Sequence, residues 1–317
     1  MKATEFIWQN GTIKPWKEAT VHVTAHALHY GSSVFEGERV YATPSGPRYF
    51  RLADHTRRLF ESAKVYDIHI GYTQAEINVA CNEVIRVNKM ASAYVRPVAF
   101  RGEGPLGVIR HDDSRIDVCI IAWDWGAYLG DAVENGADIC ISSWHRPAPN
   151  TIPAWAKAGG NYLSSQLIGF EARRNGYHEG IALGYNGLLA EGAGENIFIV
   201  RDGKIRTPSS SASILAGITR DSVLTLAGKL GLPVEERDIP REALYIADEV
   251  FMVGTAAEIT PVRSVDRKLV GDGKPGPMTK ALQKAFFGLF DGTTKDEWGW
   301  LSSVDGSASK VSKKEAA

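Results

Sequence analysis

The amino-acid sequence predicts a two-domain α+β protein. At 317 residues the chain is long enough for two domains of ordinary size. Short segments rich in Val, Ile and aromatic residues are interspersed with segments whose apolar residues recur at helical spacing. This pattern is interrupted at a segment that contains Gly126 and Gly130. We therefore expect a small domain over 1–124, an interdomain loop over 125–133, a larger domain over 134–302 and a disordered tail over 303–317.

The first 124 residues contain signals for an antiparallel sheet with two helices. Asn10-Gly11 between short apolar segments is a hairpin signal. Thr73 followed by Glu76 is a capping box, which predicts that a helix begins there and runs to about Asn88. The remaining predicted elements are a helix over 54–64 and strands over 93–100 and 116–123.

The second part alternates strands and helices and is α/β-like. Two of its helices are expected to end at Gly176 and Gly231, the residue type that most often follows a helix. Strands are predicted at 138–144, 180–184, 196–201, 204–207 and 249–253, and helices at 161–175, 219–229 and 277–290. From Ser302 onward the chain is rich in Ser, Lys and Ala, a composition typical of disordered termini.

Bulk properties exclude several classes of function. The formal net charge of -1 creates no field that would attract nucleic acid or an anionic membrane. Apolar runs such as 118–123 are too short to span a bilayer, and the first eight residues lack a secretory signal pattern. Cys81, Cys119 and Cys140 form no CxxC motif, so we expect no disulfide framework, no metal site and a cytoplasmic location.

Lys157 is the first candidate catalytic residue. It lies in the segment 156–162 among small, mostly apolar neighbours, just before a predicted helix. Such surroundings disfavour the ammonium form and lower the pKa of a lysine, and Schiff-base chemistry requires a neutral amine. Gly159 and Gly160 would let the backbone approach a flat ligand closely. Taken alone, the segment is more typical of an exposed loop lysine.

Glu191 is the second candidate. It opens a glycine-punctuated turn, which leads into an apolar strand that begins at Asn196. A carboxylate in this place could face a protonated ring nitrogen and make a pyridine ring an electron sink. The simpler interpretation is a polar loop between two strands.

Two further segments could present backbone N–H groups to a phosphate. Gly217 precedes a helix whose first turn contains Thr219 and Asp221, and helix N-termini bind anions. The segment 254–260 places small residues after a strand. Ordinary helix capping and a plain turn are the alternatives.

The motif Gly102-x-Gly104-x-x-Gly107 matches the dinucleotide fingerprint literally. Pro105 and the residues that follow do not open a helix, and no βαβ unit surrounds the motif. We interpret it as a flexible loop. HExxH, GxSxG and metal-spaced Cys/His motifs do not occur in the sequence.

Together these segments resemble the class IV (fold-type IV) pyridoxal-phosphate enzymes, and among them the bacterial branched-chain aminotransferases. The resemblance covers nearly everything except about the last fifteen residues. The matching segments are 26–31 with 35–37, 94–97, 125–130, 156–162, 191–196, 205–207, 215–220 and 248–257. The implied fold is a small α/β sandwich domain joined to a larger pseudo-barrel β domain with helices.

The resemblance implies pyridoxal 5′-phosphate as cofactor and a role for each of seven residues. Lys157 would form the Schiff base and move the proton, Glu191 would pair with the ring nitrogen, and Tyr162 with the phenolic oxygen. The phosphate would be bound by the side chains of Arg58 and Thr255 and the backbone of Ile218 and Thr219. Each role agrees with the chemistry of the residue type.

For the substrate, the resemblance implies one pocket that accepts both a branched side chain and glutamate. Tyr94 and the N–H groups of Thr255 and Ala256 would hold the α-carboxylate, and Arg96 the second carboxylate of glutamate. Residues Phe35, Trp125, Tyr128 and Tyr162 would form the apolar walls. Tyr30 and Val108 would reach in from a neighbouring subunit, which implies a dimer at least.

These roles predict ping-pong transamination of leucine, isoleucine and valine with 2-oxoglutarate. The same fold contains D-amino-acid aminotransferases, which have an Arg-x-His carboxylate trap, and 4-amino-4-deoxychorismate lyases. The sequence has no Arg-x-His and has Tyr94-x-Arg96 instead. A non-catalytic relative would have lost Lys157 or Glu191. Two features depart from the pattern: the segment 130–136 is a residue shorter than in enterobacterial relatives, and Glu38 stands where we expect an apolar residue.

Overall fold

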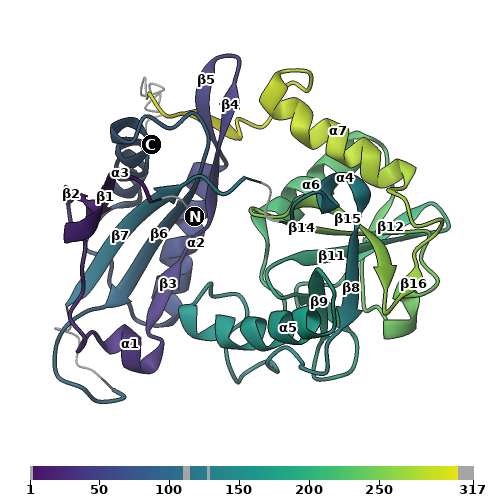
Figure 1. Cartoon of the computed structure of the whole chain (residues 1–317), viewed down its shortest axis with the longest axis horizontal. Helices are drawn as coiled ribbons and strands as arrows, with labels where there is room; N and C mark the ends of the chain where they lie inside the picture. The colour runs from purple at the N-terminus through teal and green to yellow at the C-terminus, as the bar shows by residue number, and fades with distance from the viewer. Residues whose placement is uncertain (1–2, 110–114, 127–128, 306–317) are drawn as a thin grey trace, which may run out of the picture.

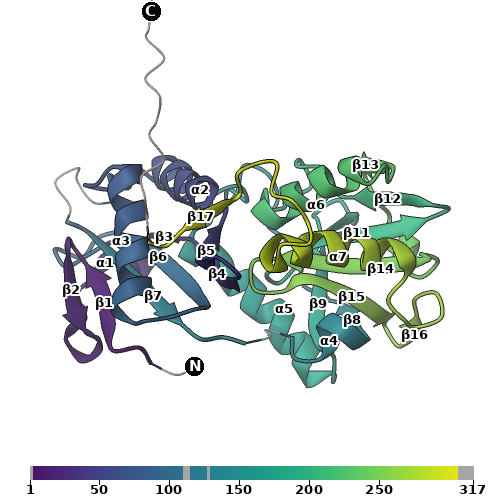
Figure 2. The ribbon, with the colours of Figure 1, turned by 90° about the horizontal axis from the view of Figure 1, so that it is seen from above.

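The computed structural model of the chain describes residues 3–109, 115–126 and 129–305. It has two lobes side by side, each built around one sheet (Figures 1 and 2). The mixed α/β architecture expected from the sequence is confirmed. Among the described residues, the helices lack the combination of length and apolarity that a bilayer crossing requires.

The first lobe contains an eight-stranded sheet in the order β17-β5-β4-β6-β7-β1-β2, with β3 paired to β6. Its strands are β1 (Phe6–Gln9), β2 (Thr12–Pro15), β3 (Ser33–Phe35), β4 (Glu38–Thr43), β5 (Gly46–Phe50), β6 (Ala93–Arg101), β7 (Ile116–Trp123) and β17 (Leu301–Ser303). Its helices are α1 (His26–Tyr30), α2 (Leu52–Val65) and α3 (Gln74–Val87), with a 3-10 turn η1 (Trp16–Glu18). Strands β6 and β7 pair antiparallel, so the glycine-rich segment 102–107 is a loop without the βαβ context of a dinucleotide site.

The second lobe contains a nine-stranded sheet in the order β10-β9-β8-β15-β14-β11-β12-β13, with β16 paired to β15. An additional pairing of β10 with β11 curls the sheet back on itself. Its strands are β8 (Ala137–Ile141), β9 (Glu179–Leu183), β10 (Leu189–Gly192), β11 (Asn196–Arg201), β12 (Lys204–Thr207), β13 (Val234–Glu236), β14 (Glu249–Gly254), β15 (Glu258–Val265) and β16 (Lys268–Leu269). Its helices are α4 (Ala132–Asn135), α5 (Tyr162–Arg174), α6 (Ile218–Lys229) and α7 (Pro277–Asp291), with 3-10 turns η2 (Gly159–Asn161) and η3 (Arg241–Leu244).

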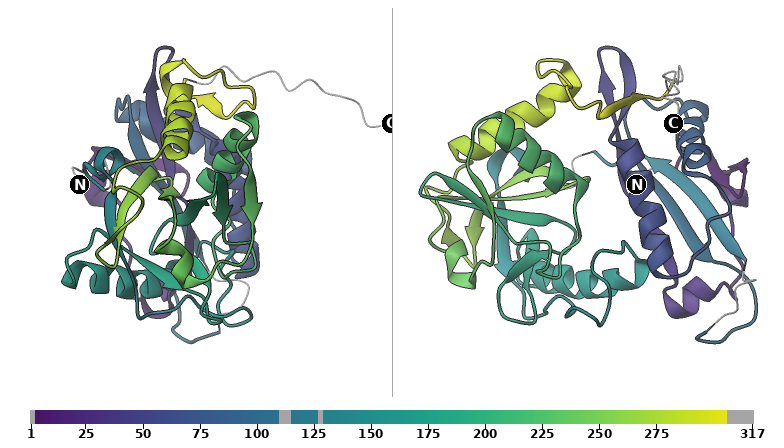
Figure 3. Two further views of the ribbon diagram at one scale, coloured as in Figure 1. Left: turned by 90° about the vertical axis from the view of Figure 1, so that its right-hand side faces the viewer. Right: turned by 180° about the vertical axis from the view of Figure 1, so that it is seen from behind.

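The end of the described chain returns to the first lobe, which corrects the expected boundary at residue 302. Strand β17 pairs antiparallel with β5, and the views in Figure 3 show it crossing from α7 to that hairpin. The Val304 side chain is buried in the first core. The expectation of a disordered tail from residue 303 is therefore wrong for Ser303 and Val304, because backbone pairing and apolar burial hold them. Residues 306–317 lie outside the described part of the chain.

Local signals explain why several elements begin and turn where they do. Asn10 and Gly11 both have positive φ, of 50° and 89°, as the tight turn between β1 and β2 requires. The Thr73 side chain accepts from the Glu76 N–H and the Glu76 side chain accepts from the Thr73 N–H, which completes the predicted capping box. Helix α7 has Pro277 in its first turn and ends at Gly292 in the left-handed region.

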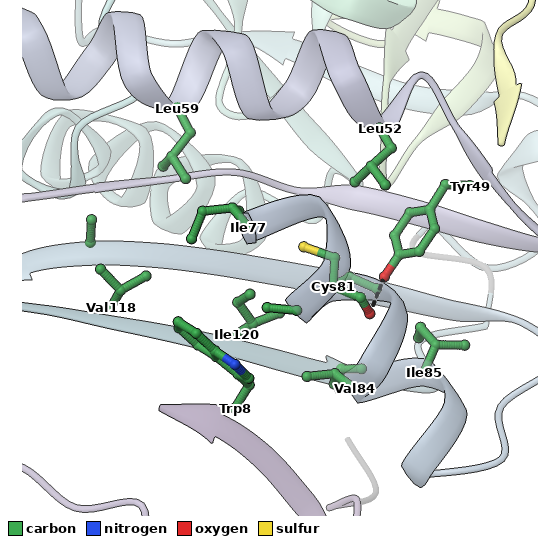
Figure 4. Close-up of a cluster of buried hydrophobic side chains, with 14 of the residues drawn as sticks. Trp8, Tyr49, Leu52, Leu59, Ile77, Cys81, Val84, Ile85, Val118 and Ile120 are labelled. Carbon is green, nitrogen blue, oxygen red and sulfur yellow. Dashed lines mark hydrogen bonds between the residues drawn. The ribbon is translucent and has the colours of Figure 1, made fainter. Parts of the chain in front are cut away.

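The core of the first lobe lies between the sheet and helices α2 and α3 (Figure 4). Leu59, Ile77 and Ile120 are fully buried there, and the Tyr49 hydroxyl donates to the Cys81 carbonyl at 2.8 Å. Two further apolar clusters lie in the second lobe, and one of them includes Phe50 from the first. This shared cluster packs β5 against α7 and joins the lobes at one side.

Strand β4 has one face in this core and one face toward the second lobe. Val40 and Glu38 are both completely buried on the core side. Among the described residues, neither carboxyl oxygen of Glu38 has an N–H or O–H partner, and the weakly donating Cys81 thiol is its polar neighbour. Burial and the neighbouring Glu36 carboxylate raise the pKa of Glu38 well above its usual range. Burial therefore favours the protonated form of this carboxyl over the ionised form.

Replacing Glu38 with isoleucine should stabilise the fold increasingly as pH rises. The folded chain binds the Glu38 proton more tightly than the unfolded chain, so the wild-type free energy of unfolding falls above the unfolded pKa of about 4.3. The Glu38→Ile variant has no such carboxyl, so its free energy of unfolding does not fall in this way. The difference between variant and wild type should grow by up to about 1.4 kcal/mol for each pH unit until the pKa of Glu38 in the folded protein is reached. Urea denaturation from pH 5 to 8, with Glu61→Gln as exposed control, measures the difference. A difference that does not change with pH would contradict the prediction.

Candidate active site

Lys157 lies on the segment between β8 and α5, which docks on the first lobe. The Phe35 N–H on β3 donates to the Lys157 carbonyl at 3.0 Å, and the Lys157 N–H donates to Ser62 Oγ on α2 at 3.0 Å. A Cβ at Gly159 would lie 2.3 Å from Ser33 Oγ, so glycine is needed for this close approach. The lysine is thus held between the two lobes and does not lie on an exposed loop.

The Lys157 amine is held close to two aromatic rings. Its Nζ donates to the Tyr162 hydroxyl at 2.8 Å, and Tyr162 is the first residue of α5. The Nζ also lies 5.1 Å from the centre of the Phe35 ring and 5.3 Å from that of Tyr162. Two residues that the sequence assigned to the same cofactor are therefore in direct contact.

Glu191 is buried on strand β10, not in a polar loop. Its Oε2 accepts from the Asn196 side-chain amide at 3.1 Å and from the Leu215 N–H at 3.0 Å. Its Oε1 lies 2.8 Å from Arg146 Nη2. Burial raises the pKa of Glu191, and the guanidinium of Arg146 and the Leu215 N–H act against that shift. These three contacts fix the orientation of the Glu191 carboxylate in the wall of the cavity.

Arg146 is a site residue that sequence reasoning missed. It follows β8, is 7% exposed, and has its backbone N–H bonded to the Leu183 carbonyl. Its Nη1 donates to Ser165 Oγ on α5 at 3.2 Å. An arginine in a Pro-rich segment gives no sequence signal for burial. Its burial depends on the ion pair with Glu191, which lies far away in the sequence and offsets the cost of desolvating the charge.

Arg58 lies on the buried face of α2 and lines the same cavity. Its Nε and Nη2 donate to the two Glu36 oxygens at 2.6 and 2.8 Å, and its Nη1 donates to the Ala216 carbonyl at 2.9 Å. His55 adds a 2.7 Å contact to the same carboxylate. Burial raises the pKa of Glu36, but Arg58 and His55 outweigh it and hold that pKa well below the usual range. Glu36 and His55 were not predicted as site residues.

The N-terminus of α6 faces the same end of the cavity as Arg58. Helix α6 begins at Ile218 after Gly217, and no side chain caps it among the described residues. A Cβ at Gly217 would lie 2.0 Å from Asn196 Oδ1, so only glycine allows the helix to start this close to the Glu191 network. Its first N–H groups, together with Arg58, form a donor set suited to an anion.

One pocket collects the predicted cofactor residues. Its lining includes Arg58, Lys157, Tyr162, Glu191, Ile218, Thr219 and Thr255, and adds Arg146 and Asn196. A second cavity adjoins it through Tyr162, and it is lined by Phe35 and Arg96 among others. The two cavities are therefore contiguous.

The predicted substrate residues of the first sheet gather beside this cavity. Arg96 Nη2 donates to the Tyr94 hydroxyl at 3.0 Å, and its guanidinium lies 4.6 Å from the centre of the Phe35 ring. The Trp125 ring meets Tyr94 edge-on at 4.4 Å. A Cβ at Gly37 would lie 1.9 Å from the Tyr94 hydroxyl, which explains the glycine after Glu36.

The other predicted substrate residues are Thr255, Ala256, Tyr30, Val108 and Tyr128. Thr255 and Ala256 lie in the turn between β14 and β15, with Thr255 at the pocket. Tyr30 and Val108 are exposed on the first lobe and do not line the pocket of their own chain. Tyr128 lies outside the described residues.

Comparison with protein families agrees with this geometry. The amino-transferase class IV family matches residues 33–265. A branched-chain-amino-acid aminotransferase of Escherichia coli (strain K12) is 55% identical over 305 residues, which are 96% of this chain and 99% of that protein. One from Pseudomonas aeruginosa is 45% identical over 299 residues, 94% of this chain and 97% of that protein.

Solved structures give the same result. The crystal structure of the E. coli branched-chain amino acid aminotransferase matches with a TM-score of 0.94 and 56% identity, covering 95% of this chain and 99% of that one. The Thermobaculum terrenum enzyme in its PLP-form (holo-form) matches with a TM-score of 0.89 and 36% identity, covering 96% of this chain and 99% of that one. The chain belongs to the class IV aminotransferase family. Within that family, both sets of relatives are branched-chain-amino-acid aminotransferases.

Replacing Glu36 with glutamine should destabilise the protein, because Arg58 would remain buried without its counter-charge. Breaking one partner of a buried ion pair costs about 3–5 kcal/mol. We expect a lower urea midpoint for Glu36→Gln at fixed protein concentration and neutral pH. Glu61→Gln is the matched control, since Glu61 is exposed on the same helix as Arg58 and lies 4.0 Å from Arg57. Equal midpoints for the two variants would contradict the prediction.

Proposed function

We propose that this chain transfers the amino group of L-leucine, L-isoleucine or L-valine to 2-oxoglutarate in a ping-pong reaction at the site between the lobes. The observation that supports it most is the convergence of Lys157, Tyr162, Glu191 and Arg58 on one pocket. The chain is a branched-chain-type transaminase that uses pyridoxal 5′-phosphate. The D-amino-acid and lyase alternatives are not favoured, since the relatives reported above are branched-chain enzymes.

The donor set of the pocket fits this cofactor. Arg58 and the uncapped start of α6 offer cationic and N–H donors for a phosphate, and Glu191 offers a carboxylate for a ring nitrogen. When bound, the cofactor supplies an aldehyde that captures the substrate amine and a ring that withdraws electrons from its Cα. Lys157 would bind that aldehyde, and Tyr162 would hold the phenolic oxygen. Ile218, Thr219 and Thr255 would complete the phosphate site.

Proton transfer in this site would depend on Lys157. Its Nζ lies between the Tyr162 hydroxyl and the Phe35 ring, where a base could take a proton from the substrate Cα and return it to the cofactor side. The buried Arg146 keeps a positive charge 2.8 Å from Glu191 Oε1, which favours the ionised carboxylate. An ionised Glu191 would in turn keep the ring nitrogen protonated.

Substrate selection would rest on the face of the first sheet that contains Tyr94 and Arg96. Tyr94 and the N–H groups of Thr255 and Ala256 would bind the α-carboxylate that every substrate has. Arg96 would bind only the second carboxylate of glutamate or 2-oxoglutarate. Phe35 and Tyr162, whose rings lie 4.8 Å apart, would form apolar walls with Trp125 and Tyr128 for a branched side chain.

The site would be completed by a second subunit of a homo-oligomer. Val108 and Ile109 are 77% and 90% exposed, and Tyr30 and Leu28 are exposed on the same end of the first lobe. Helix α5, beside the pocket, exposes Leu163, Leu167 and Phe170. Exposed apolar residues grouped in this way mark protein interfaces. Tyr30 and Val108 of a neighbour would then reach the substrate.

A cytoplasmic location is part of the same proposal. Cys81, Cys119 and Cys140 are buried free thiols in the described structure. Burial raises the pKa of Cys119 and of Cys140 to about 11, so both remain thiols at neutral pH. Unpaired thiols of this kind suit a reducing compartment.

The Lys157→Ala variant should bind the cofactor but lose transamination. Arg58, Glu191 and the α6 N-terminus remain, so affinity for pyridoxal phosphate is expected to persist, while turnover falls at least about a thousandfold without the base. Borohydride reduction followed by mass spectrometry should show a covalent adduct on wild type and on a Lys64→Ala control, and none on Lys157→Ala. Normal turnover by Lys157→Ala would refute the role.

The Arg96→Met variant should separate the two kinds of substrate. We expect the KM for 2-oxoglutarate to rise about a hundredfold, because a buried carboxylate would lose its charged partner. The KM for L-leucine should change far less, since methionine keeps apolar contact with Phe35. Steady-state kinetics with both substrates on the same variant provides an internal control. Equal increases would count against one pocket with a separate place for the second carboxylate.

A further inference from the structure

Arg39 links the two lobes at the edge of the substrate site. It lies on β4 as the direct cross-strand partner of Tyr94 on β6, so the two side chains share the sheet face that looks toward the second lobe. Its side chain is 18% exposed. Because Glu38 and Val40 point into the core, Arg39 is positioned by the strand itself to reach out of the first lobe.

The guanidinium of Arg39 contacts three carbonyl groups on two segments outside the first sheet. Its Nη1 lies 3.5 Å from the Thr255 oxygen and 3.3 Å from the Ala256 oxygen, in the turn between β14 and β15. Its Nη2 donates to the Gly126 carbonyl at 3.1 Å, one residue after Trp125. One side chain thus ties β4 to both the turn and the connection between the lobes.

A counter-charge holds Arg39 in this position. Glu258 Oε1 lies 3.5 Å from Arg39 Nη1 and accepts from the Tyr41 hydroxyl at 2.9 Å. Tyr41 stacks on Phe290 of α7 with ring centres 3.5 Å apart. Glu258 has a positive φ of 54°, a conformation that a non-glycine residue adopts only when its surroundings fix it. The geometry around Arg39 is therefore determined from both lobes.

We infer that Arg39 is a positioning residue for the substrate α-carboxylate, acting through the turn at 255–257, an inference that rests on the proposed function. The Thr255 carbonyl and the Ala256 N–H belong to one planar peptide and point in opposite directions. Holding the oxygen therefore fixes the direction of that N–H, which is one of the two proposed carboxylate donors. A cationic donor on the carbonyl also polarises the N–H and strengthens its hydrogen bond to an anion.

This role predicts a kinetic pattern different from that of Arg96. Every substrate of the enzyme has an α-carboxylate, so loss of Arg39 should affect the amino acid and the keto acid equally. For Arg39→Lys and Arg39→Met we expect KM for L-leucine and for 2-oxoglutarate to rise by the same factor, about five- to twentyfold, the effect of weakening one charge-assisted hydrogen bond. Lysine keeps the positive charge, but its ammonium group cannot donate to three carbonyls in the directions that the planar guanidinium reaches. Arg39→Lys therefore tests geometry without removing charge.

Binding measurements separate positioning from general structure. The dissociation constant of 4-methylvalerate, a branched carboxylate without an amine, should rise by the same factor, measured by the visible absorbance of the holoenzyme. Affinity of the apoprotein for pyridoxal phosphate, measured by fluorescence titration, should stay within about twofold of wild type. At Thr255, Arg39 contacts the backbone oxygen, whereas the proposed phosphate ligand is the side-chain hydroxyl. Arg58 and the α6 N–H groups would still bind the phosphate. Arg48→Met on the neighbouring strand β5 is the control, and all its constants should match wild type.

Each outcome decides between positioning, a structural role and failure of the proposed function. Unchanged KM values and 4-methylvalerate affinity in both Arg39 variants overturn the inference while the proposed function stands. Equal weakening of cofactor and carboxylate binding also overturns it, since that indicates a general structural role. A wild-type protein that neither exchanges amino groups with L-leucine nor binds 4-methylvalerate overturns the proposed function, and this inference with it.

Discussion

The site depends on the docking of one segment of the second lobe on strand β3 of the first. The Phe35 N–H to Lys157 carbonyl bond and the bridge between Val34 and Ala158 extend the edge of the first sheet with a piece of chain that then enters α5. Backbone hydrogen bonds fix direction as well as distance. The lysine side chain is therefore presented between the lobes, where Tyr162 and Glu191 approach it from the second lobe and Arg58 from the first.

Two buried ion pairs and one partly buried ion pair each fix a different part of the site. Glu36 orients Arg58, Arg146 orients Glu191, and Glu258 orients Arg39. Buried pairs contribute little net stability, because desolvation offsets the Coulomb attraction. Their value here is geometric, since each holds a charged group in one orientation before a ligand arrives. Preorganised charges of this kind need no rearrangement when an anionic ligand enters.

Sequence reasoning located the elements whose signals are local. Strands 116–123, 196–201 and 204–207 were predicted with the bounds observed. The first two contain runs of apolar residues, and the third alternates buried residues with more exposed ones. Strands β3, β4 and β5 were missed. They are short, Gly37 and Pro44 lie between them, and pairing with one another and with β6 and β17 makes them strands. Strand β10, which contains Glu191, was taken for a turn because Gly192 and Gly194 follow the glutamate.

The same distinction applies to the site. Lys157, Glu191 and Arg58 occur in recognisable motifs, whereas Glu36, Arg146 and Arg39 act through partners that only the folded chain brings close. A sequence pattern shows only which residues are neighbours along the chain. The roles of these three residues depend on partners that are distant in the sequence and close in space. Glu38 shows the converse: the sequence marked it as out of place, and the structure explains only why its pKa is raised.

One face of the first sheet packs in the core and the other faces the second lobe, and this arrangement limits how the register of the strands can change. Along β4, Glu38 and Val40 point into the core while Arg39 and Tyr41 point toward the second lobe, and along β6 Val95 is buried while Tyr94 and Arg96 reach the site. Because side chains alternate strictly along a strand, a shift of one residue would exchange the two sets. Core packing therefore enforces the register that aligns Arg39 with Tyr94. The residues of the first lobe that we propose bind the substrate carboxylate are therefore aligned by the packing of the apolar residues beneath them.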